Sequence, residues 1–155
     1  MAPFVLLVGS MTGNAEFAAE EMIQILKDEF GREAELRMMD GLGADVFRPG
    51  TIYLICTSTY GEGEVPENAK GFYAALCEQR PDLSAIRYAV FGLGDSTYTG
   101  TFNFGGKRFD DILTELGARR LGERSKHDIR SDARPWDYGR DWLRAWYEAQ
   151  RGTLD

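Results

Sequence analysis

Short apolar segments that alternate with helical patterns constrain the fold of this chain more than any other feature. Strand-like segments cover residues 4–8, 34–39, 51–57, 87–93 and 118–123. Helical periodicity covers residues 14–30, 66–80, 103–116 and 131–150. The runs at residues 4–8 and 51–57 are apolar without polar alternation, which is typical of strands covered on both faces. Parallel strands need long crossovers, which helices supply, so the pattern predicts an open, doubly wound α/β sheet with helices on both faces.

Size and charge narrow the classes of protein that fit. The 155 residues are 43% hydrophobic, enough for the core of one domain covering residues 1–155. The net charge of −7 argues against nucleic acid and against anionic membrane surfaces as partners. No apolar run is long enough to cross a bilayer, and no basic segment precedes residues 4–8, so a secretory signal is not supported. Two cysteines form no disulfide framework, which favours a reducing, cytoplasmic compartment.

The loop after the first predicted strand has the composition of an anion-binding loop. Residues 9–15 read Gly-Ser-Met-Thr-Gly-Asn-Ala and fit neither the dinucleotide fingerprint nor the Walker loop. Its hydroxyl and amide side chains stand before a predicted helix N-terminus, a combination that binds phosphate without a cation. The same residues are also favoured as simple helix caps, so this loop alone leaves both interpretations open.

The loops after the third and fourth predicted strands each combine glycines with one tyrosine. The first contains Tyr60 within Ser-Thr-Tyr-Gly-Glu-Gly-Glu, and the second contains Tyr98 within Gly-Leu-Gly-Asp-Ser-Thr-Tyr. Glycine lets the backbone approach a flat ring closely, and a tyrosine can stack on it. Because ligands of such sheets bind at the carboxyl ends of the strands, these loops predict a pocket for an aromatic ring with a phosphate tail.

Together, the three loops resemble the FMN loops of flavodoxins. The segments are Ser-Met-Thr-Gly-Asn-Ala, Ser-Thr-Tyr-Gly-Glu-Gly-Glu-Val-Pro-Glu-Asn-Ala and Phe-Gly-Leu-Gly-Asp-Ser-Thr-Tyr. They are most similar to those of MioC-type flavodoxins and of the FMN domains of diflavin reductases, and the similarity extends over nearly the whole chain. The resemblance implies a flavodoxin-like five-stranded parallel sheet of order 2-1-3-4-5 and FMN as the cofactor.

The resemblance also implies a role for individual residues. The phosphate would be wrapped by Ser10, Met11, Thr12, Gly13, Asn14 and Ala15. One side of the flavin ring would be lined by Ser58, Thr59, Tyr60, Gly61 and Gly63, with Tyr60 stacked on it. The other side would be lined by Leu93, Gly94, Asp95 and Tyr98. Phe102 and Asn103 match a Phe-Asn pair of the diflavin domains, although the segment before them is one residue longer here, and Asp128 matches an aspartate that contacts the ribityl chain or a loop.

The ring-side loops predict how such a flavin would be tuned. The acidic residues Glu62, Glu64, Glu67 and Asp95 would disfavour an anionic reduced flavin and so lower its potential. In flavodoxins, the peptide at the position of Gly61 turns to offer its carbonyl to flavin N5, which a side chain would hinder. We therefore expect an electron carrier without a substrate site of its own, and no metal.

The expected partners are an NADPH-dependent flavodoxin or ferredoxin reductase and an acceptor redox enzyme, with biotin synthesis suggested by MioC-type relatives. The alternative is a small FMN-dependent NAD(P)H oxidoreductase acting on quinones or nitro compounds. The acidic loops, which would repel a dinucleotide phosphate, favour the carrier.

Residues outside these loops predict no other chemistry. Cys56 is expected in the core, because the phosphatase pattern C-x₅-R has Glu62 in place of its arginine. The single histidine, His127, is expected to be a solvated loop residue. Trp142 and Trp146, four residues apart, are expected on the core face of the last helix.

Overall fold

A parallel sheet forms the centre of the computed structural model, which describes residues 1–10 and 12–154. Its strands are β1 (Phe4–Gly9), β2 (Ala34–Met38), β3 (Ile52–Thr57), β4 (Arg87–Gly94), β5 (Arg119–Arg120) and β6 (Ser125–Asp128). The helices are α1 (Asn14–Asp28), α2 (Lys70–Gln79), α3 (Phe104–Glu115) and α4 (Pro135–Gln150), with 3₁₀ turns η1 (Ala44–Val46), η2 (Glu67–Ala69) and η3 (Arg151–Thr153). The strand order β2-β1-β3-β4-β5 confirms the predicted doubly wound topology.

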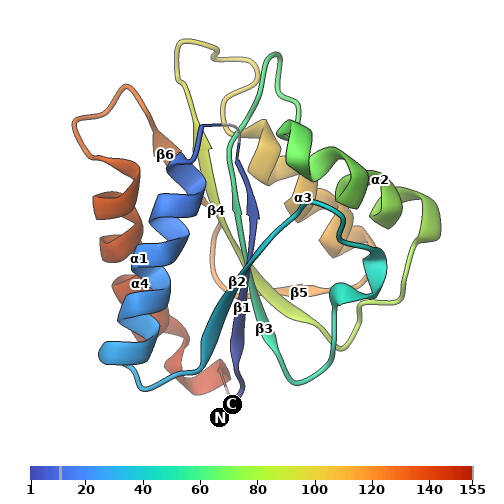
Figure 1. The fold of residues 1–155 in the computed structure, drawn as a ribbon, viewed down its shortest axis with the longest axis vertical. Coiled ribbons are helices and arrows are strands. Elements are labelled where there is room, and N and C mark those ends of the chain that lie inside the picture. The colour runs from blue at the N-terminus through green and yellow to red at the C-terminus, as the bar shows by residue number, and fades with distance from the viewer. Residues whose placement is uncertain (11, 155) are drawn as a thin grey trace.

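Helices cover both faces of the sheet. Helices α1 and α4 pack on one face, and α2 and α3 pack on the other (Figure 1). Neighbouring residues of β1 point to opposite faces, with Leu6 in the first core cluster and Leu7 in the second, and both are fully buried. The apolar run of β1 has no polar alternation because neither of its faces meets water.

The fifth position in the sheet is shared by two short strands. Strand β5 pairs with the start of β4, and β6 pairs with its end, both in parallel. The predicted strand over 118–123 is therefore wrong beyond Arg120. Gly122 has a φ of +80° and its carbonyl accepts a hydrogen bond from Arg120 Nε at 2.8 Å. This left-handed residue ends β5, and the strand resumes only at Ser125.

The helix boundaries follow their local signals, with two shifted starts. Gly31 follows α1 with a φ of +64°, which is typical of a residue that ends a helix. The last helix was predicted from residue 131 but begins at Pro135, because proline is favoured at the first helical position. The segment after Pro66 first forms η2, so that α2 begins only at Lys70. Among the residues that the structure describes, no helix is both long enough and apolar enough to span a bilayer.

Candidate functional site

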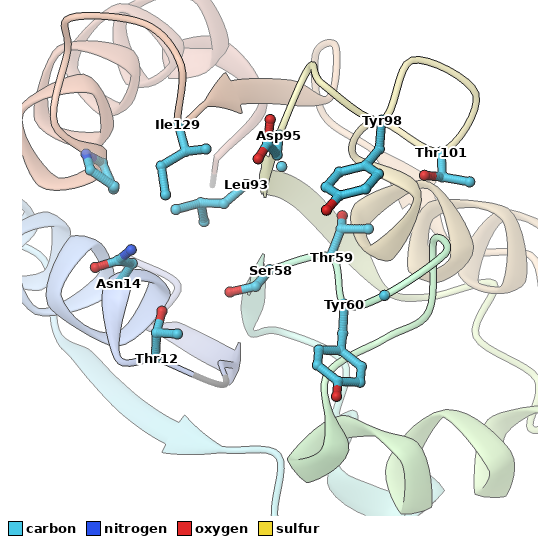
Figure 2. A pocket seen from close by; sticks show the side chains of 13 residues that line it. Thr12, Asn14, Ser58, Thr59, Tyr60, Leu93, Asp95, Tyr98, Thr101 and Ile129 are labelled. Carbon is cyan, nitrogen blue, oxygen red and sulfur yellow. The ribbon is translucent and has the colours of Figure 1, made fainter.

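A cavity of about 440 Å³ opens at the carboxyl ends of β1, β3, β4 and β6. Figure 2 shows its lining side chains, which come from the loops after these strands and from the first residues of α1 and α4. Ten of the predicted site residues line it: Thr12, Asn14, Ser58, Thr59, Tyr60, Gly61, Leu93, Gly94, Asp95 and Tyr98. Three further residues, Thr101, Ile129 and Pro135, line it without having been predicted.

The remaining predicted residues lie beside or behind this lining. These are Ser10, Gly13, Ala15, Gly63, Phe102, Asn103 and Asp128, while Met11 lies outside the described residues. The side chain of Ala15 is fully buried in the core under α1, so only its backbone N–H is available to a ligand at the helix start. Sequence reasoning therefore located the loops, but not which of their residues face the cavity.

The start of α1 presents hydrogen-bond donors to the cavity. Gly13, with a φ of +88°, precedes the helix, and the first helical hydrogen bond runs from the Phe17 N–H to the Gly13 carbonyl at 2.9 Å. The N–H groups of Asn14 and the two residues after it come before that bond and so have no partner within the helix. Ser10 Oγ accepts from the Gly13 N–H at 3.0 Å, which leaves its own hydroxyl proton free to donate. This donor set, at the positive end of a helix dipole, suits a phosphate.

Asn68, which sequence reasoning missed, holds the first loop in place. Its Oδ1 accepts from the Ser10 N–H at 2.9 Å, and its Nδ2 donates to the Val8 carbonyl at 3.3 Å and to Asp40 Oδ1 at 3.1 Å. The residue lies within the Val-Pro-Glu-Asn segment already noted for its resemblance, which was the available signal. It couples the loop after β3 to the loop after β1.

The loop after β3 folds into a tight turn around two glycines. Tyr60 and Glu64 exchange backbone hydrogen bonds of 2.8 Å, and Gly61 and Gly63 between them have φ values of +52° and +95°. A Cβ on Gly63 would lie 3.0 Å from side-chain atoms of Phe104 and Thr101, whereas one on Gly61 would meet no atom of the described residues within 4 Å. Gly63 is thus required by packing as well as by conformation, and the space beside Gly61 is open.

The same loop rests directly on the first turn of α3. The Gly105 N–H donates to Thr59 Oγ1 at 3.0 Å. A Cβ on Gly105 would lie only 2.1 Å from the Ser58 carbonyl oxygen. The close approach of helix and loop therefore depends on glycine at this position, and the Gly-Gly pair inside a predicted helix was its sequence signal.

The loop after β4 carries Asp95 and Tyr98. Asp95 Oδ1 accepts from the Thr97 N–H at 2.9 Å and from Arg130 Nε at 3.2 Å. The hydrogen bonds from Thr97, and then from Arg130, hold the pKa of Asp95 below its usual range. Figure 2 shows the Tyr98 ring turned toward Thr59 and the Tyr60 ring extending in another direction, and both rings are exposed.

Asn103 lies behind this loop and supports it through buried contacts. It is fully buried with a φ of +58°, and its Nδ2 donates to the His127 carbonyl at 3.1 Å. Its amide lies against Gly92 and Gly94, where an added Cβ would approach Asn103 atoms at 2.6 and 2.8 Å. Its position points to a structural role under the Tyr98 loop, and Phe102 before it is half-buried.

Asp128 is the last residue of β6 and ties two loops together. Its Oδ1 accepts from the Ser96 N–H at 3.1 Å and from the Arg130 N–H at 2.9 Å. Hydrogen bonds from Ser96 and from the Arg130 backbone hold the pKa of Asp128 below its usual range. The structure thus places Asp128 where it contacts a loop, which is one of the two roles that the resemblance implied.

The prediction for His127 is wrong. The residue is part of β6 rather than a solvated loop, and it is fully buried. Its Nε2 lies 2.7 Å from the Ala133 carbonyl, and its ring packs edge-on against Tyr138 at 5.1 Å. The error follows from the split strand, because a strand that ended at residue 123 would have left His127 outside the sheet.

Two other predictions about the core are confirmed. Cys56 is fully buried in β3, and burial raises the pKa of its thiol. Trp146 is buried on the inner face of α4, where Trp142 packs against the same cluster.

The acidic residues of the ring-side loops are largely ion-paired. Lys70 Nζ lies 3.2 Å from Glu67 and 3.5 Å from Glu64, and Arg130 lies 3.2 Å from Asp95. The sequence pattern does not show these pairs, because the start of α2 brings Lys70 to Glu64 and Glu67 and the loop after β6 brings Arg130 to Asp95. The negative field at the pocket is therefore weaker than the sequence predicts.

Comparison with known proteins assigns the family. The sequence profile described as Flavodoxin matches residues 6–136. The chain is 37% identical to Protein MioC of Escherichia coli O157:H7, over 94% of this chain and 97% of that protein. It is 36% identical to the sulfite reductase [NADPH] flavoprotein alpha-component of Bacillus subtilis, over 96% of this chain but only 24% of that protein.

Among solved structures, a point mutant of a flavodoxin from Pseudomonas aeruginosa superposes with a TM-score of 0.83 and 31% identity. The match covers 97% of this chain and 99% of that one. The relative and the solved structure match along almost the whole length of the chain, and the profile agrees with them over residues 6–136. The chain belongs to the flavodoxin family of FMN-binding electron-transfer proteins.

Proposed function

We propose that this protein carries single electrons from an NADPH-dependent flavodoxin or ferredoxin reductase to an acceptor redox enzyme, using FMN bound in the pocket described above. The observation that carries the proposal is one cavity that joins a phosphate-type donor set at α1 to two glycine-tyrosine loops after β3 and β4. Family membership supports redox partners in general, and the identity of each partner belongs to the proposal.

The residues of the pocket fit FMN in both of its parts. The phosphate would lie at the start of α1, within reach of Ser10, Thr12 and Asn14, where backbone N–H groups accommodate its charge. The flavin ring would be held by the loops of Tyr60 and Tyr98, with Leu93 as an apolar residue lining the same cavity. When bound, FMN supplies the one-electron chemistry, and the chain binds it, orients it and limits the access of water.

Backbone freedom at Gly61 supports a role in adjusting to the redox state of the ring. Its φ of +52° is readily reached by glycine, and no atom in the part of the chain that the structure describes lies within 4 Å of the position of a Cβ. The peptide between Gly61 and Glu62 therefore has both the conformational freedom and the space to turn the Gly61 carbonyl toward the ring.

The acceptor is an enzyme that consumes electrons one at a time, and biotin synthesis is our candidate from the likeness to MioC. We further propose that the exchange takes place in the reducing cytoplasm, which the two free cysteines support.

The alternative, an NAD(P)H oxidoreductase acting on quinones or nitro compounds, is less favoured by the likeness to flavodoxins.

An anaerobic reductive titration of the purified holoprotein, followed by absorbance, tests the proposal. We expect stoichiometric FMN and reduction in two resolved one-electron steps. Reduction in a single two-electron step would contradict the carrier function.

Mixing the holoprotein with NADPH distinguishes the two functions. We expect the flavin absorbance to persist with NADPH alone and to bleach once a flavodoxin reductase is added. Rapid bleaching by NADPH without a reductase would favour the oxidoreductase.

A further inference from the structure

Hydrogen bonds on the rim of the pocket join the loop after β4 to the loop after β6. The Ile129 N–H donates to the Gly94 carbonyl at 2.9 Å, and the Ser96 N–H donates to Asp128 Oδ1 at 3.1 Å. Both loops contribute to the cavity, through Asp95 on one side and Ile129 on the other. The shape of the rim therefore depends on how firmly these loops are held together.

The side chain of Arg130 also connects the loop after β6 to the loop after β4. Its Nε is shared between Asp95 Oδ1 at 3.2 Å and Thr97 Oγ1 at 2.9 Å, both on the opposite loop. The Arg130 side chain is 62% exposed, so its folding role is small, whereas the Asp95 carboxylate that it meets is 29% exposed. A positive charge on the outer side of Asp95 thus draws the loop of Tyr98 toward β6.

Movement of Asp95 would be passed on to the ring side of the cavity. The Tyr98 N–H donates to the Asp95 carbonyl at 3.1 Å, and the Thr97 N–H donates to the Asp95 carboxylate at 2.9 Å. The segment from Asp95 to Tyr98 is therefore a single hydrogen-bonded turn. Freeing its outer end from Arg130 would loosen the turn as a unit, and the tyrosine with it.

We propose that Arg130 is a positioning residue that closes the pocket rim through Asp95 and thereby slows the release of bound FMN. The inference rests on the proposed function for the identity of the ligand. It requires no contact between Arg130 and the flavin, because the effect passes through the Asp95 turn. It is specific to the ring side of the cavity, since the phosphate end is built from α1 and Asn68.

The test is the rate at which FMN leaves the holoprotein after dilution, followed by the recovery of free flavin fluorescence. We expect Arg130→Gln to release FMN roughly two- to fivefold faster. This factor is the ratio of rates that corresponds to the free energy typical of an exposed ion pair. Arg130→Lys, which keeps the charge, should restore part of the slow release. The matched control is Arg144→Gln, which breaks a comparably exposed pair between α4 and Glu29, away from the cavity, and should release FMN at the wild-type rate.

A double-mutant cycle shows whether Arg130 acts through Asp95. In an Asp95→Asn background we expect Arg130→Gln to have a smaller effect than in the wild type, because the ion pair has already been removed and only the hydrogen bond to Thr97 Oγ1 remains. The proposal is overturned if Arg130→Gln retains FMN like the wild type, if Lys is no better than Gln, or if the effect of Arg130→Gln is undiminished beside Asp95→Asn. Failure of the wild-type protein to bind FMN at all would instead contradict the proposed function.

Discussion

Gly61 and Gly63 lie in one turn, but different physical constraints favour glycine at the two positions. Both have positive φ, but only at Gly63 would an added Cβ press on Thr101 and Phe104, at 3.0 Å. We expect Gly61→Ala to lower the free energy of unfolding by about 1 kcal/mol through backbone strain alone. Gly63→Ala should cost about 2–3 kcal/mol, because displacement of packed neighbours is added to the strain. Urea unfolding of the two apoproteins measures both, and equal costs would contradict the distinction.

At the scale of residues, the sequence predicted which residues belong to the loops of the site better than it predicted where their side chains point. Asn103 was expected at the cofactor, but it lies buried beneath the loop and donates to the His127 carbonyl. Arg130 went unnoticed, although it contacts Asp95 directly. A motif fixes which residues follow a strand, whereas the direction of each side chain depends on backbone angles and on neighbours that are distant in the sequence. Asn68, which is 58 residues from Ser10, is such a neighbour.

Helix α3 and the Ser58 loop approach each other so closely that a side chain at Gly105 would not fit between them. A Cβ on Gly105 would overlap the Ser58 carbonyl oxygen at 2.1 Å. We expect Gly105→Ala to cost about 3 kcal/mol of unfolding free energy, the upper part of the range for overpacking, and to weaken FMN binding by displacing Thr59.

Gly71 provides the matched control for that substitution. It lies in α2 and is exposed, and an added Cβ would meet none of residues 1–10 and 12–154 within 4 Å. Gly71→Ala should therefore stabilise the protein by about 0.5–1 kcal/mol, with no effect on FMN affinity. Chemical unfolding and FMN titration of both variants check the expectation. A Gly71→Ala variant less stable than the wild type would contradict it, because alanine should then not have been favoured over glycine at this helical position.

The joint between the loops after β4 and β6 should make stability depend on pH through Asp128. The pKa of Asp128 is held below its usual value of 3.8 by hydrogen bonds from Ser96 and from the Arg130 backbone. A carboxyl with a depressed folded-state pKa stabilises the fold above its unfolded pKa, and this contribution is lost as pH falls through the folded pKa. We expect Asp128→Asn to be less stable than the wild type at neutral pH, with the difference shrinking below about pH 4. Urea midpoints measured across this range test it, and a difference that stays constant would contradict it.

The elements themselves were largely predictable, except at the fifth strand. Continuous apolar runs and helical periodicity identified β1, β3, β4 and all four helices, because these elements bury whole faces. The fifth position failed because its strands are short and pair mainly through the backbone with β4. Such pairing leaves little hydrophobic pattern in the sequence, and Gly122 divided the segment at a point that periodicity could not identify.

The whole molecule carries a formal charge of −7, which should guide its encounter with a basic partner. We expect reduction by a flavodoxin reductase to slow as ionic strength rises from about 0.01 to 0.15 M, because the Debye length falls from about 30 to 8 Å. Stopped-flow measurement of flavin reduction checks this, with an uncharged chemical reductant as the control that salt should not affect. A rate of reduction by the reductase that does not change with salt concentration would contradict the prediction that charge attraction guides docking.

The divided fifth strand has a consequence for the edges of the sheet. A long, flat edge strand offers free N–H and C=O groups on which a strand of another chain can build. Here, one edge consists of two short pieces interrupted at Gly122, with the exposed Arg119 and Arg120 in the first piece, and the other edge, β2, carries the exposed Glu35 and Arg37. Neither edge gives a second copy a continuous, uncharged template. The irregularity that misled the sequence prediction thus protects the folded chain against growth into shared sheets and aggregates.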